Sequence, residues 1–377
     1  MTLSKKPILI FLITEASYFL SHRLPLGLAA LKQGYQVCLV TCPQNHTKHL
    51  ESLGFKVYPL RHMTRANCTP WQELKSLYEI YTIYKKIQPD IVHQVAMKPV
   101  LYGTIAARLA HVPCIINALA GLGYAFTSPS LKAKTLKRFI LCFFKILLKH
   151  KNVHLIIQNQ DDQVFFTPLL QPHHTHLIRG AGVDLKTFCP PSTPPKNKIF
   201  TIALVARLLW DKGIQEAIDA IHMLKEKGLK IQLVVVGGVD PQNPSAIPKE
   251  TVMEWQKDKD CEWIDHTDHV EKIYHKADLA ILPSYREGLP KSLLEAAACG
   301  LAIVTTDVPG CREIVVHNKN GLLVPAKDGL KLAEAIEFLY SSEKTRKKFA
   351  HESRALVEKY FSEERVVQET LALYKKI

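Results

Sequence analysis

The chain has 377 residues, of which 47% are apolar and 22% are charged, and its net charge is +14. These proportions suit a globular protein of two domains, and no uninterrupted apolar run reaches the roughly 20 residues that a membrane-spanning helix needs. The nine cysteines include no Cys-x-x-Cys pair, so the sequence indicates neither a disulfide framework nor a zinc knuckle, and it favours a reducing cytoplasm.

The positive charge is concentrated in the first half of the chain. Residues 1–190 contain 22 Lys and Arg against 8 Asp and Glu, whereas residues 191–377 contain 27 of each kind. No carboxylate side chain occurs between Asp90 and Asp161. A one-sided positive field of this kind attracts nucleic acid, anionic lipid headgroups or diphosphate-linked substrates.

Short apolar runs alternate with helix-like stretches through this half. The run at 8–13 follows a charged opening, as in a signal peptide, but it is short and lacks a small-residue cleavage site, so we interpret it as a strand. Further strands are predicted at 37–41, 56–60, 91–93, 114–118, 153–159 and 175–179, and helices at 22–33, 71–87 and 102–110. This alternation predicts a parallel sheet that is covered on both faces.

A proline-rich stretch interrupts the alternation. Residues 189–198 contain four prolines, which suit neither a helix nor a central strand, so we place a linker there. A second series follows, with strands at 200–205, 231–236, 279–283 and 302–305 and helices at 213–225, 270–275 and 290–298. We therefore expect an α/β protein with two Rossmann-like domains, 1–188 and 199–361, and a final helical segment, 362–377, that packs back toward the first.

The strongest local signal lies between a predicted strand and a predicted helix, at residues 283–296. Gly288 allows a tight turn, and Pro290 suits the first position of a helix because it needs no amide hydrogen there. Glu287 precedes this helix and Glu295 lies inside it, so two carboxylates can address the two ends of one ligand, a sugar and a ribose. The amide groups that can cradle a diphosphate at the helix start are those of Gly288, Leu289, Lys291 and Ser292.

The frame around the two glutamates, Glu-Gly-x-Pro followed after four residues by Glu-Ala, resembles the donor-site motif of the family 4 retaining glycosyltransferases. Segments similar to that family also occur, in the same order, at 180–184, 205–213, 306–313 and 320–325. The resemblance implies the GT-B fold, in which two Rossmann-like domains face each other across a cleft, the first binding the acceptor and the second the nucleotide sugar. It also implies that Arg207 and Lys212 grip the donor diphosphate and that Glu287 is catalytic.

The same resemblance bears on cofactors and on the donor. A departing nucleoside diphosphate gains negative charge, which two fixed cations and oriented amide groups can stabilise. No Asp-x-Asp cluster follows the end of a strand to hold Mg²⁺, so we expect a metal-independent reaction that needs no cofactor. The family implies a UDP-sugar donor, carrying a hexose or an N-acetylhexosamine, and retention of configuration. Whether Glu287 attacks the anomeric carbon or only stabilises charge stays open.

The first domain departs from the family pattern in one loop. Many family members carry a His where this chain has Ala120, and His93, at the end of a neighbouring predicted strand, is either a catalytic group of the same cleft or a structural residue. Candidate acceptor contacts in the cleft loops are Glu15, His22, Lys98, Gly121 and Gly123. These loops resemble the branch that builds bacterial capsules, O-antigens and lipid-linked oligosaccharides, including N-acetylgalactosaminyl transfer. The implied acceptor is a saccharide on undecaprenyl diphosphate.

Residues 130–151 predict a basic amphipathic helix. At 100° per residue five of its seven cations, Lys134, Lys137, Arg138, Lys145 and Lys149, fall within an arc of about 120°, and apolar residues, Ile146 among them, fill the other side. Such a helix is either a packed helix with a solvated cationic face or a contact with an anionic membrane. Together with the carboxylate-free region around it, the pattern favours attachment to the inner face of the cytoplasmic membrane. The cations that would make this contact are Lys134, Arg138, Lys145 and Lys149.

Two alternatives stay open. A GT-B-fold sugar-nucleotide epimerase would consume the donor without any acceptor, and its product would be an isomerised sugar nucleotide. A nucleic-acid-binding module is suggested by the net charge of +14. The sequence contains no zinc-binding spacing, no RNP-type aromatic strand and no Arg-rich tail, so we expect no nucleic-acid partner.

Overall fold

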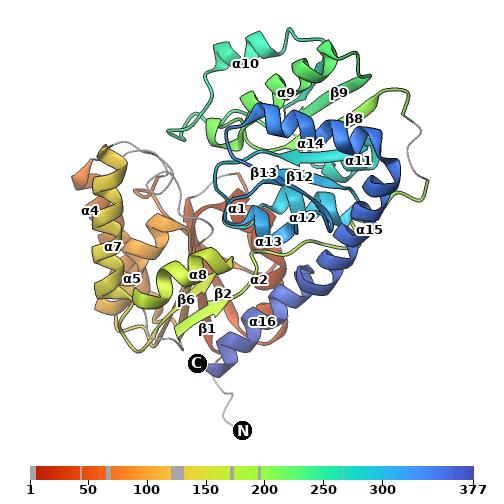
Figure 1. Cartoon of the computed structure of the whole chain (residues 1–377). Helices are drawn as coiled ribbons and strands as arrows, with labels where there is room; N and C mark the ends of the chain where they lie inside the picture. The colour runs from red at the N-terminus through yellow and green to blue at the C-terminus, as the bar shows by residue number, and fades with distance from the viewer. Residues whose placement is uncertain are drawn as a thin grey trace. The chain divides into compact units, whose positions relative to one another are not determined.

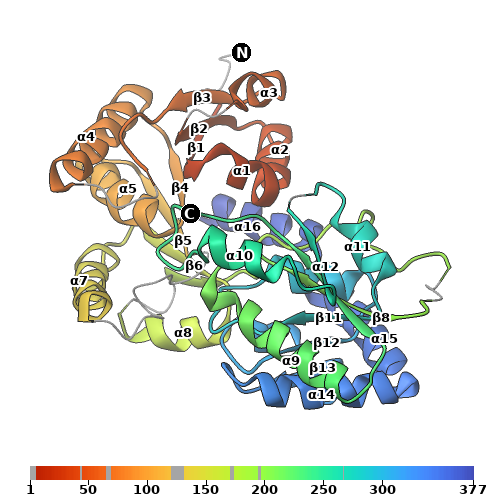
Figure 2. The same cartoon turned by 90° about the horizontal axis from the view of Figure 1, so that it is seen from above.

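The structure is a computed structural model and describes residues 6–42, 45–64, 69–119, 131–169, 174–193, 197–265 and 267–377. The chain forms two compact units. The first unit comprises Met1–Ala181 together with Val366–Ile377, and the second comprises Gly182–Arg365. Each unit is an open sheet of parallel strands with helices on both faces (Figures 1 and 2).

The sheet of the first unit has seven strands in the order β3-β2-β1-β4-β5-β6-β7. They are β1 (Ile8–Glu15), β2 (Gln36–Cys42), β3 (Lys56–Pro59), β4 (Ile91–Val95), β5 (Cys114–Ala118), β6 (Val153–Ile157) and β7 (Thr175–Leu177). Side chains alternate along β1, so that Leu9 and Phe11 enter one hydrophobic core and Ile10 and Leu12 enter the other. Burial on both faces explains why these strands are continuous apolar runs in the sequence.

Two layers of helices cover this sheet. One core is closed by α1 (Ala16–His22), α2 (Leu24–Lys32), α3 (Thr47–Ser52) and the part of α16 (Glu363–Lys376) that starts at Val366. The other is closed by α4 (Pro70–Ile87), α5 (Met97–Leu109), α7 (Leu131–Leu147) and α8 (Gln160–Phe166), which is followed by a 3₁₀ turn, Thr167–Leu169. The C-terminal end of the chain therefore contributes to the core of the first unit.

The predicted start of the helix at 22–33 is wrong. The structure has two helices there, α1 and α2, which are separated at Arg23 with φ at −132°, outside the helical range. Pro25 lies in the first turn of α2, where a missing amide hydrogen costs nothing, and it marks a new helix start that the apolar period does not reveal.

The second unit repeats the design with six strands in the order β10-β9-β8-β11-β12-β13. They are β8 (Phe200–Val205), β9 (Ile231–Val236), β10 (Cys261–Ile264), β11 (Leu279–Leu282), β12 (Ile303–Thr306) and β13 (Gly321–Val324). One core is closed by α9 (Ile214–Glu226), α10 (Lys249–Trp255) and α14 (Gly329–Ser341). The other is closed by α11 (Val270–Lys276), α12 (Lys291–Ala298), α13 (Cys311–Ile314) and α15 (Glu343–Tyr360).

Two Rossmann-like units with parallel sheets confirm the predicted fold class. The sequence missed β10 and β13, because β10 contains the charged Glu262 and β13 begins at Gly321, so neither forms the continuous apolar run by which the other strands were predicted. In each sheet the first three strands run in order from the centre to one edge, and the later strands run in order from the centre to the other edge. This order places β1 beside β4 and β8 beside β11. Ligands of open α/β sheets bind beyond the carboxyl ends of the strands at such switch points.

Candidate functional site

The predicted donor residues gather at the switch point of the second sheet. After β8 the chain runs through Arg207 into a 3₁₀ turn, Trp210–Lys212, and after β11 it runs through Glu287 into α12. Because β8 and β11 are parallel neighbours, both segments leave the same edge of the sheet. A fold-level rule therefore brings together residues that are far apart in the sequence.

Two glycines let these segments approach each other closely. Gly213 has φ at 71°, and a Cβ at this position would lie 2.1 Å from the carbonyl oxygen of Pro283. Gly310 has φ at 81°, and its Cβ would lie 2.7 Å from the carbonyl oxygen of Gly288. Real Cβ atoms do not come so close, so only glycine fits either position. The segments after β8, β11 and β12 are thus packed backbone against backbone.

The carboxylate of Glu287 lies where these segments meet. Its Oε1 forms an ion pair with Lys212 Nζ and accepts a hydrogen bond from Ser284 Oγ at 2.7 Å. Ser284 is fully buried, and its carbonyl oxygen accepts a hydrogen bond from Thr306 Oγ1. The backbone amide of Glu287 donates to the carbonyl of Pro309 at 3.2 Å. Side chain and backbone of Glu287 are therefore both held by neighbouring segments.

Helix α12 begins directly after Glu287. Its N-cap is Pro290 and its first residue is Lys291, so the predicted helix start is wrong by one position and Pro290 precedes the helix. A helix leaves its first amide groups without an intrahelical acceptor and carries a partial positive charge at this end. Gly288, Leu289, Lys291 and Ser292, the predicted cradle, form this turn and helix start.

Glu295 lies one turn into α12 and is 9% exposed. Burial raises the pKa of its carboxyl group to about 7, although Lys291, whose Nζ lies 3.6 Å from Oε1, acts in the opposite direction. In the absence of ligand this group is therefore close to half protonated at neutral pH. A ligand that donates hydrogen bonds to it would favour the ionised form.

Several groups near Glu287 and its neighbours, among them Asp240 and Glu216, were not singled out by the sequence. Arg207 forms an ion pair of 2.6 Å with Asp240, which follows β9. Tyr285 donates its hydroxyl to Glu216 at 2.6 Å and its backbone amide to the carbonyl of Asp211 at 2.9 Å. Asp211 Oδ1 is buried without a hydrogen-bond partner, and burial raises the pKa of this carboxyl group. Ser284, three residues before Glu287 inside the motif, had a usable signal, whereas Asp240 and Glu216 had none.

The predicted acceptor residues lie in the first unit. Glu15 ends β1, and Lys98 lies in the first turn of α5, just after β4, so both sit at the switch point of this sheet. Lys98 Nζ lies 2.9 Å from Glu73 Oε1 and donates to the carbonyl of Thr64 at 3.0 Å. His22 ends α1, where its ring stacks on Tyr18 with 4.3 Å between centroids. Gly121 and Gly123 lie outside the described residues.

His93 lies inside the first unit. It is 1% exposed, its Nδ1 is hydrogen-bonded to the hydroxyl of Tyr374 on α16, and its ring lies against Phe11. Burial, aided by the charge of Arg23, lowers the pKa of its imidazole well below the usual value, so the ring is neutral at physiological pH. Its Nε2 is buried without a hydrogen-bond partner. This placement favours a structural role over the catalytic one that the sequence also allowed.

The basic helix is present as α7, and its exposed side chains include Arg138 and Lys145, with Lys149 exposed just beyond its end. The side chain of Lys134 lies outside the described part. Ile146, which the sequence assigned to the apolar side of this helix, is 63% exposed and does not enter the core. Among the described residues no helix is both long and apolar enough to cross a membrane, and no group of His, Cys, Asp and Glu is arranged to hold a metal ion.

Two Rossmann-like units in one chain, the second with paired glutamates at its switch point, define a glycosyltransferase of the GT-B class. Residues 9–160 match the family model described as glycosyl transferase 4-like, and residues 187–356 match that of the glycosyl transferases group 1. The chain is a glycosyltransferase, and the two matches confirm the resemblance seen in the sequence.

Named relatives agree with this assignment. The chain is 28% identical to the N,N'-diacetylbacillosaminyl-diphospho-undecaprenol alpha-1,3-N-acetylgalactosaminyltransferase of Campylobacter jejuni, with 95% of this chain and 98% of the relative covered. It is 25% identical to the capsular polysaccharide biosynthesis glycosyltransferase CapM of Staphylococcus aureus, over 91% and 90%. It is also 28% identical to the UDP-Gal:alpha-D-GlcNAc-diphosphoundecaprenol alpha-1,3-galactosyltransferase of Escherichia coli, over 68% of each chain. The epimerase and nucleic-acid alternatives receive no support from these matches.

Solved structures share the fold. Sucrose-phosphate synthase from Thermosynechococcus elongatus superposes with a TM-score of 0.83 at 19% identity, covering 98% of this chain and 99% of the other. Anabaena HepE in complex with UDP-glucose superposes with a TM-score of 0.78 at 16% identity, covering 98% of this chain and all of the other. At these identities the likeness concerns the fold.

Proposed function

We propose that this glycosyltransferase moves a hexose or N-acetylhexosamine from a UDP-sugar to a saccharide carried on undecaprenyl diphosphate, with retention of configuration. The product would be part of a bacterial surface glycan such as an O-antigen or a capsule. The names of the Campylobacter jejuni and Escherichia coli relatives, which specify diphospho-undecaprenol acceptors, support this acceptor class. The observation that carries the chemistry is the Glu287–Lys212–Ser284 cluster beside the start of α12.

The cluster suits the departure of a nucleoside diphosphate. As the bond between the anomeric carbon and the β-phosphate oxygen breaks, its electron pair leaves with the diphosphate, and negative charge grows on the phosphate oxygens. Lys212, Arg207 and the amide groups at the start of α12 would stabilise this charge, because fixed cations and dipoles need no reorganisation during the reaction. The acceptor hydroxyl forms the new bond to the anomeric carbon, and its proton passes to an oxygen of the departing diphosphate.

Glu287 and Glu295 would hold the two ends of the donor. Glu287, oriented by Lys212 and Ser284 on Oε1, faces the sugar side and supports the positive charge that develops at the anomeric carbon. Glu295 would accept hydrogen bonds from both ribose hydroxyls, a pairing that suits a bidentate carboxylate. No metal is required in this scheme because the protein supplies the positive charge itself.

The test is a product analysis with the full chain. A set of UDP-sugars is incubated with undecaprenyl-diphosphate-linked saccharide acceptors, with and without EDTA, and the lipid-linked product is analysed by mass spectrometry and NMR. We expect a product heavier by one sugar, an anomeric centre of the same configuration as in the donor, and no loss of rate with EDTA. An isomerised sugar nucleotide without transfer would show an epimerase instead, and loss of activity in EDTA would contradict metal independence.

Such an acceptor places the enzyme at a membrane surface. Arg138, Lys145 and Lys149 are exposed on and beside α7, and cations of this kind are attracted to anionic headgroups. We include peripheral attachment to the inner face of the cytoplasmic membrane in the proposal, with α7 as the contact.

A further inference from the structure

Helix α4 presents a second unusual surface of the first unit. At 100° per residue, seven of its exposed residues fall within an arc of about 120°. On the opposite side, Ser76, Ile80 and Tyr84 are buried in the core. We call this arc the α4 face, and it consists of Trp71, Leu74, Lys75, Tyr78, Thr82, Lys85 and Lys86.

The α4 face combines large apolar side chains with positive charge. Trp71 is 66% exposed, Leu74 53% and Tyr78 67%. Three lysines are interleaved with them and the face contains no carboxylate. Amphipathic aromatic rings beside lysines are characteristic of protein surfaces at the boundary between lipid headgroups and acyl chains. A solvated surface helix would be expected to carry acidic as well as basic residues here.

The acidic residues of α4 lie outside the face and are engaged elsewhere. Glu73 pairs with Lys98 at 2.9 Å. Glu79 accepts hydrogen bonds from the backbone amides of Arg61, at 3.0 and 3.1 Å, and of His62, at 3.1 Å. Both carboxylates are therefore bound to neighbouring groups of the same unit, and the positive field of the α4 face is not cancelled by residues of its own helix.

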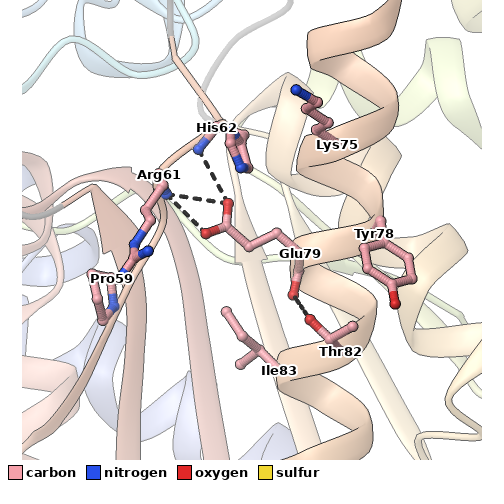
Figure 3. A pocket seen from close by; sticks show the side chains of 8 residues that line it. All are labelled: Pro59, Arg61, His62, Lys75, Tyr78, Glu79, Thr82 and Ile83. Carbon is pink, nitrogen blue, oxygen red and sulfur yellow. Dashed lines mark hydrogen bonds between the residues drawn. The ribbon is translucent and has the colours of Figure 1, made fainter.

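A hollow beside the α4 face adds one more cation, Arg61, and the imidazole of His62 (Figure 3). Arg61 and His62 come from the segment after β3, and Lys75 and Tyr78 come from the face itself; the hydrogen bonds of Glu79 hold the two walls together. The hollow is thus rimmed by groups that can meet phosphate oxygens, with an aromatic ring at its edge.

The α4 face lies in the same helical layer as α7. Helices α4 and α7 both pack their apolar sides into one core, with α5 between them, so both turn their exposed sides away from the same face of the sheet (Figures 1 and 2). Lys145 and Ile146 are exposed on α7. Two amphipathic helices in one layer can meet one surface together.

We propose that the α4 face inserts into the headgroup region of an anionic phospholipid bilayer. Trp71, Leu74 and Tyr78 would reach the boundary with the acyl chains, and the lysines would meet lipid phosphates. This contact has the same partner as the one proposed for α7 but depends on different residues. It extends the membrane attachment that the proposed function includes, but it requires nothing of the transfer chemistry, so its failure would leave the proposed transfer reaction untouched.

The test compares vesicle binding by matched variants of the full chain. Vesicles of phosphatidylcholine with and without phosphatidylglycerol are used in a flotation assay. The double variant Trp71→Ser/Tyr78→Ser should bind the anionic vesicles about tenfold more weakly than the original chain. The control Leu330→Ser/Phe338→Ser removes two exposed apolar side chains from α14 of the second unit and should bind as the original chain does. Thermal melting of both variants checks that they are folded.

A second measurement tests directly whether the α4 face reaches the acyl chains. Phospholipids brominated along their acyl chains should quench tryptophan fluorescence on binding, and Trp71→Phe should lose most of that quenching, although Trp210, Trp255 and Trp263 are still present. Unchanged vesicle affinity of Trp71→Ser/Tyr78→Ser, or equal quenching in Trp71→Phe, would overturn the proposal. Binding of RNA but not of vesicles, lost in the double variant, would also overturn it. Donor binding should be the same in the double variant and the original chain.

Discussion

At the scale of single residues, the defining feature of the site is that two donor groups contact the same carboxylate oxygen of Glu287. Glu287 Oε1 receives both Lys212 and Ser284, and neither donor uses Oε2. A carboxylate with one oxygen fixed by two donors has a defined direction. Its contribution to catalysis therefore depends on its position as much as on its charge.

Replacement of Glu287 by Ala should remove most of the turnover. The variant loses the carboxylate that we propose supports the charge at the anomeric carbon, and it leaves Lys212, whose side chain is only 16% exposed, without its ion-pair partner, while the backbone contact to Pro309 is retained. We expect an initial rate at least a hundredfold lower at saturating UDP-sugar, by analogy with the loss of one positioned electrostatic group. A melting curve like that of the original chain is the control. A wild-type rate would disprove the catalytic assignment.

Replacement of Lys212 by Ala should act mainly on donor binding. A charge-assisted hydrogen bond to a phosphate is worth about 1.5–3 kcal/mol, so the dissociation constant of UDP-N-acetylgalactosamine should rise by roughly 10- to 150-fold. Calorimetric titration measures this change. Lys331→Ala, on the exposed surface of α14, is the matched control and should bind the donor normally. Equal affinity of the Lys212 and Lys331 variants would refute a diphosphate at Lys212.

The Glu295 carboxyl predicts a pH dependence of donor affinity. Its pKa in the ligand-free protein is raised to about 7, and only the ionised form can accept hydrogen bonds from both ribose hydroxyls. Affinity for UDP-N-acetylgalactosamine should therefore be high above pH 7 and fall by up to about tenfold per pH unit below it. The test is a series of titrations between pH 5.5 and 8.5. In Glu295→Gln the affinity should be lower and flat with pH; a slope that persists would place the titrating group elsewhere.

At the scale of elements, the site depends on three turns that leave neighbouring parallel strands. The segments after β8, β11 and β12 touch through Gly213 and Gly310, where no side chain fits. The contacts among these three segments, and not the conformation of any one loop, therefore set the distance between Lys212 and Glu287. This explains how groups 75 residues apart in the chain can meet at hydrogen-bonding distance.

Replacement of Gly310 by Ala should disturb this arrangement. The new Cβ would lie 2.7 Å from the carbonyl oxygen of Gly288 and would push the turn that carries Glu287. Gly228→Ala is the matched control, because Gly228 also has a positive φ, of 82°, but a Cβ there meets nothing within 4 Å. Both variants bear backbone strain of about 1 kcal/mol, and Gly310→Ala should lose a further 1–2 kcal/mol of stability and most of its activity. Chemical denaturation and initial rates measure this; similar results for the two would contradict the packing argument.

At the scale of the whole molecule, charge and layer structure act together. The excess of Lys and Arg belongs to the first 190 residues, and part of it lies on one helical layer of the first unit. Long-range attraction brings a basic surface to an anionic membrane, and it weakens within about 8 Å at physiological salt. A binding energy that depends on charge must therefore respond to charge reversal and to salt.

Reversal of the charges on α7 should weaken membrane binding. Lys134, Arg138, Lys145 and Lys149 are changed together to Glu, and flotation with phosphatidylglycerol vesicles is measured at low and high salt. We expect a large loss at low salt, since each basic residue near the surface contributes about 1 kcal/mol. The matched control changes four exposed lysines of the second unit to Glu, Lys227, Lys331, Lys347 and Lys348, and should bind normally. Equal recovery with neutral and anionic vesicles would rule out the contact.

Features that depend on neighbours in sequence were predictable from the sequence. The alternation of apolar runs and helical stretches determined two Rossmann-like units, and the frame around Glu287 and Glu295 determined the family, because both depend on spacing within a few turns of chain. The strands β10 and β13 were not predicted, since Glu262 interrupts the first and Gly321 begins the second, and neither is a continuous apolar run.

Other features were decided only by tertiary structure. His93 was predicted at the end of a strand, either as a catalytic group of the cleft or as a structural residue, but it lies inside β4, where Tyr374 of the C-terminal helix contacts it and the side chain is buried and neutral. Ile146 lies at the edge of the apolar side of α7, next to the cationic arc, and the packing of α7 against the core leaves it exposed. The convergence of Lys212 and Ser284 on Glu287 and the burial that raises the pKa of Glu295 arise from contacts between distant segments. Such contacts depend on strand order and packing, which local sequence spacing does not encode.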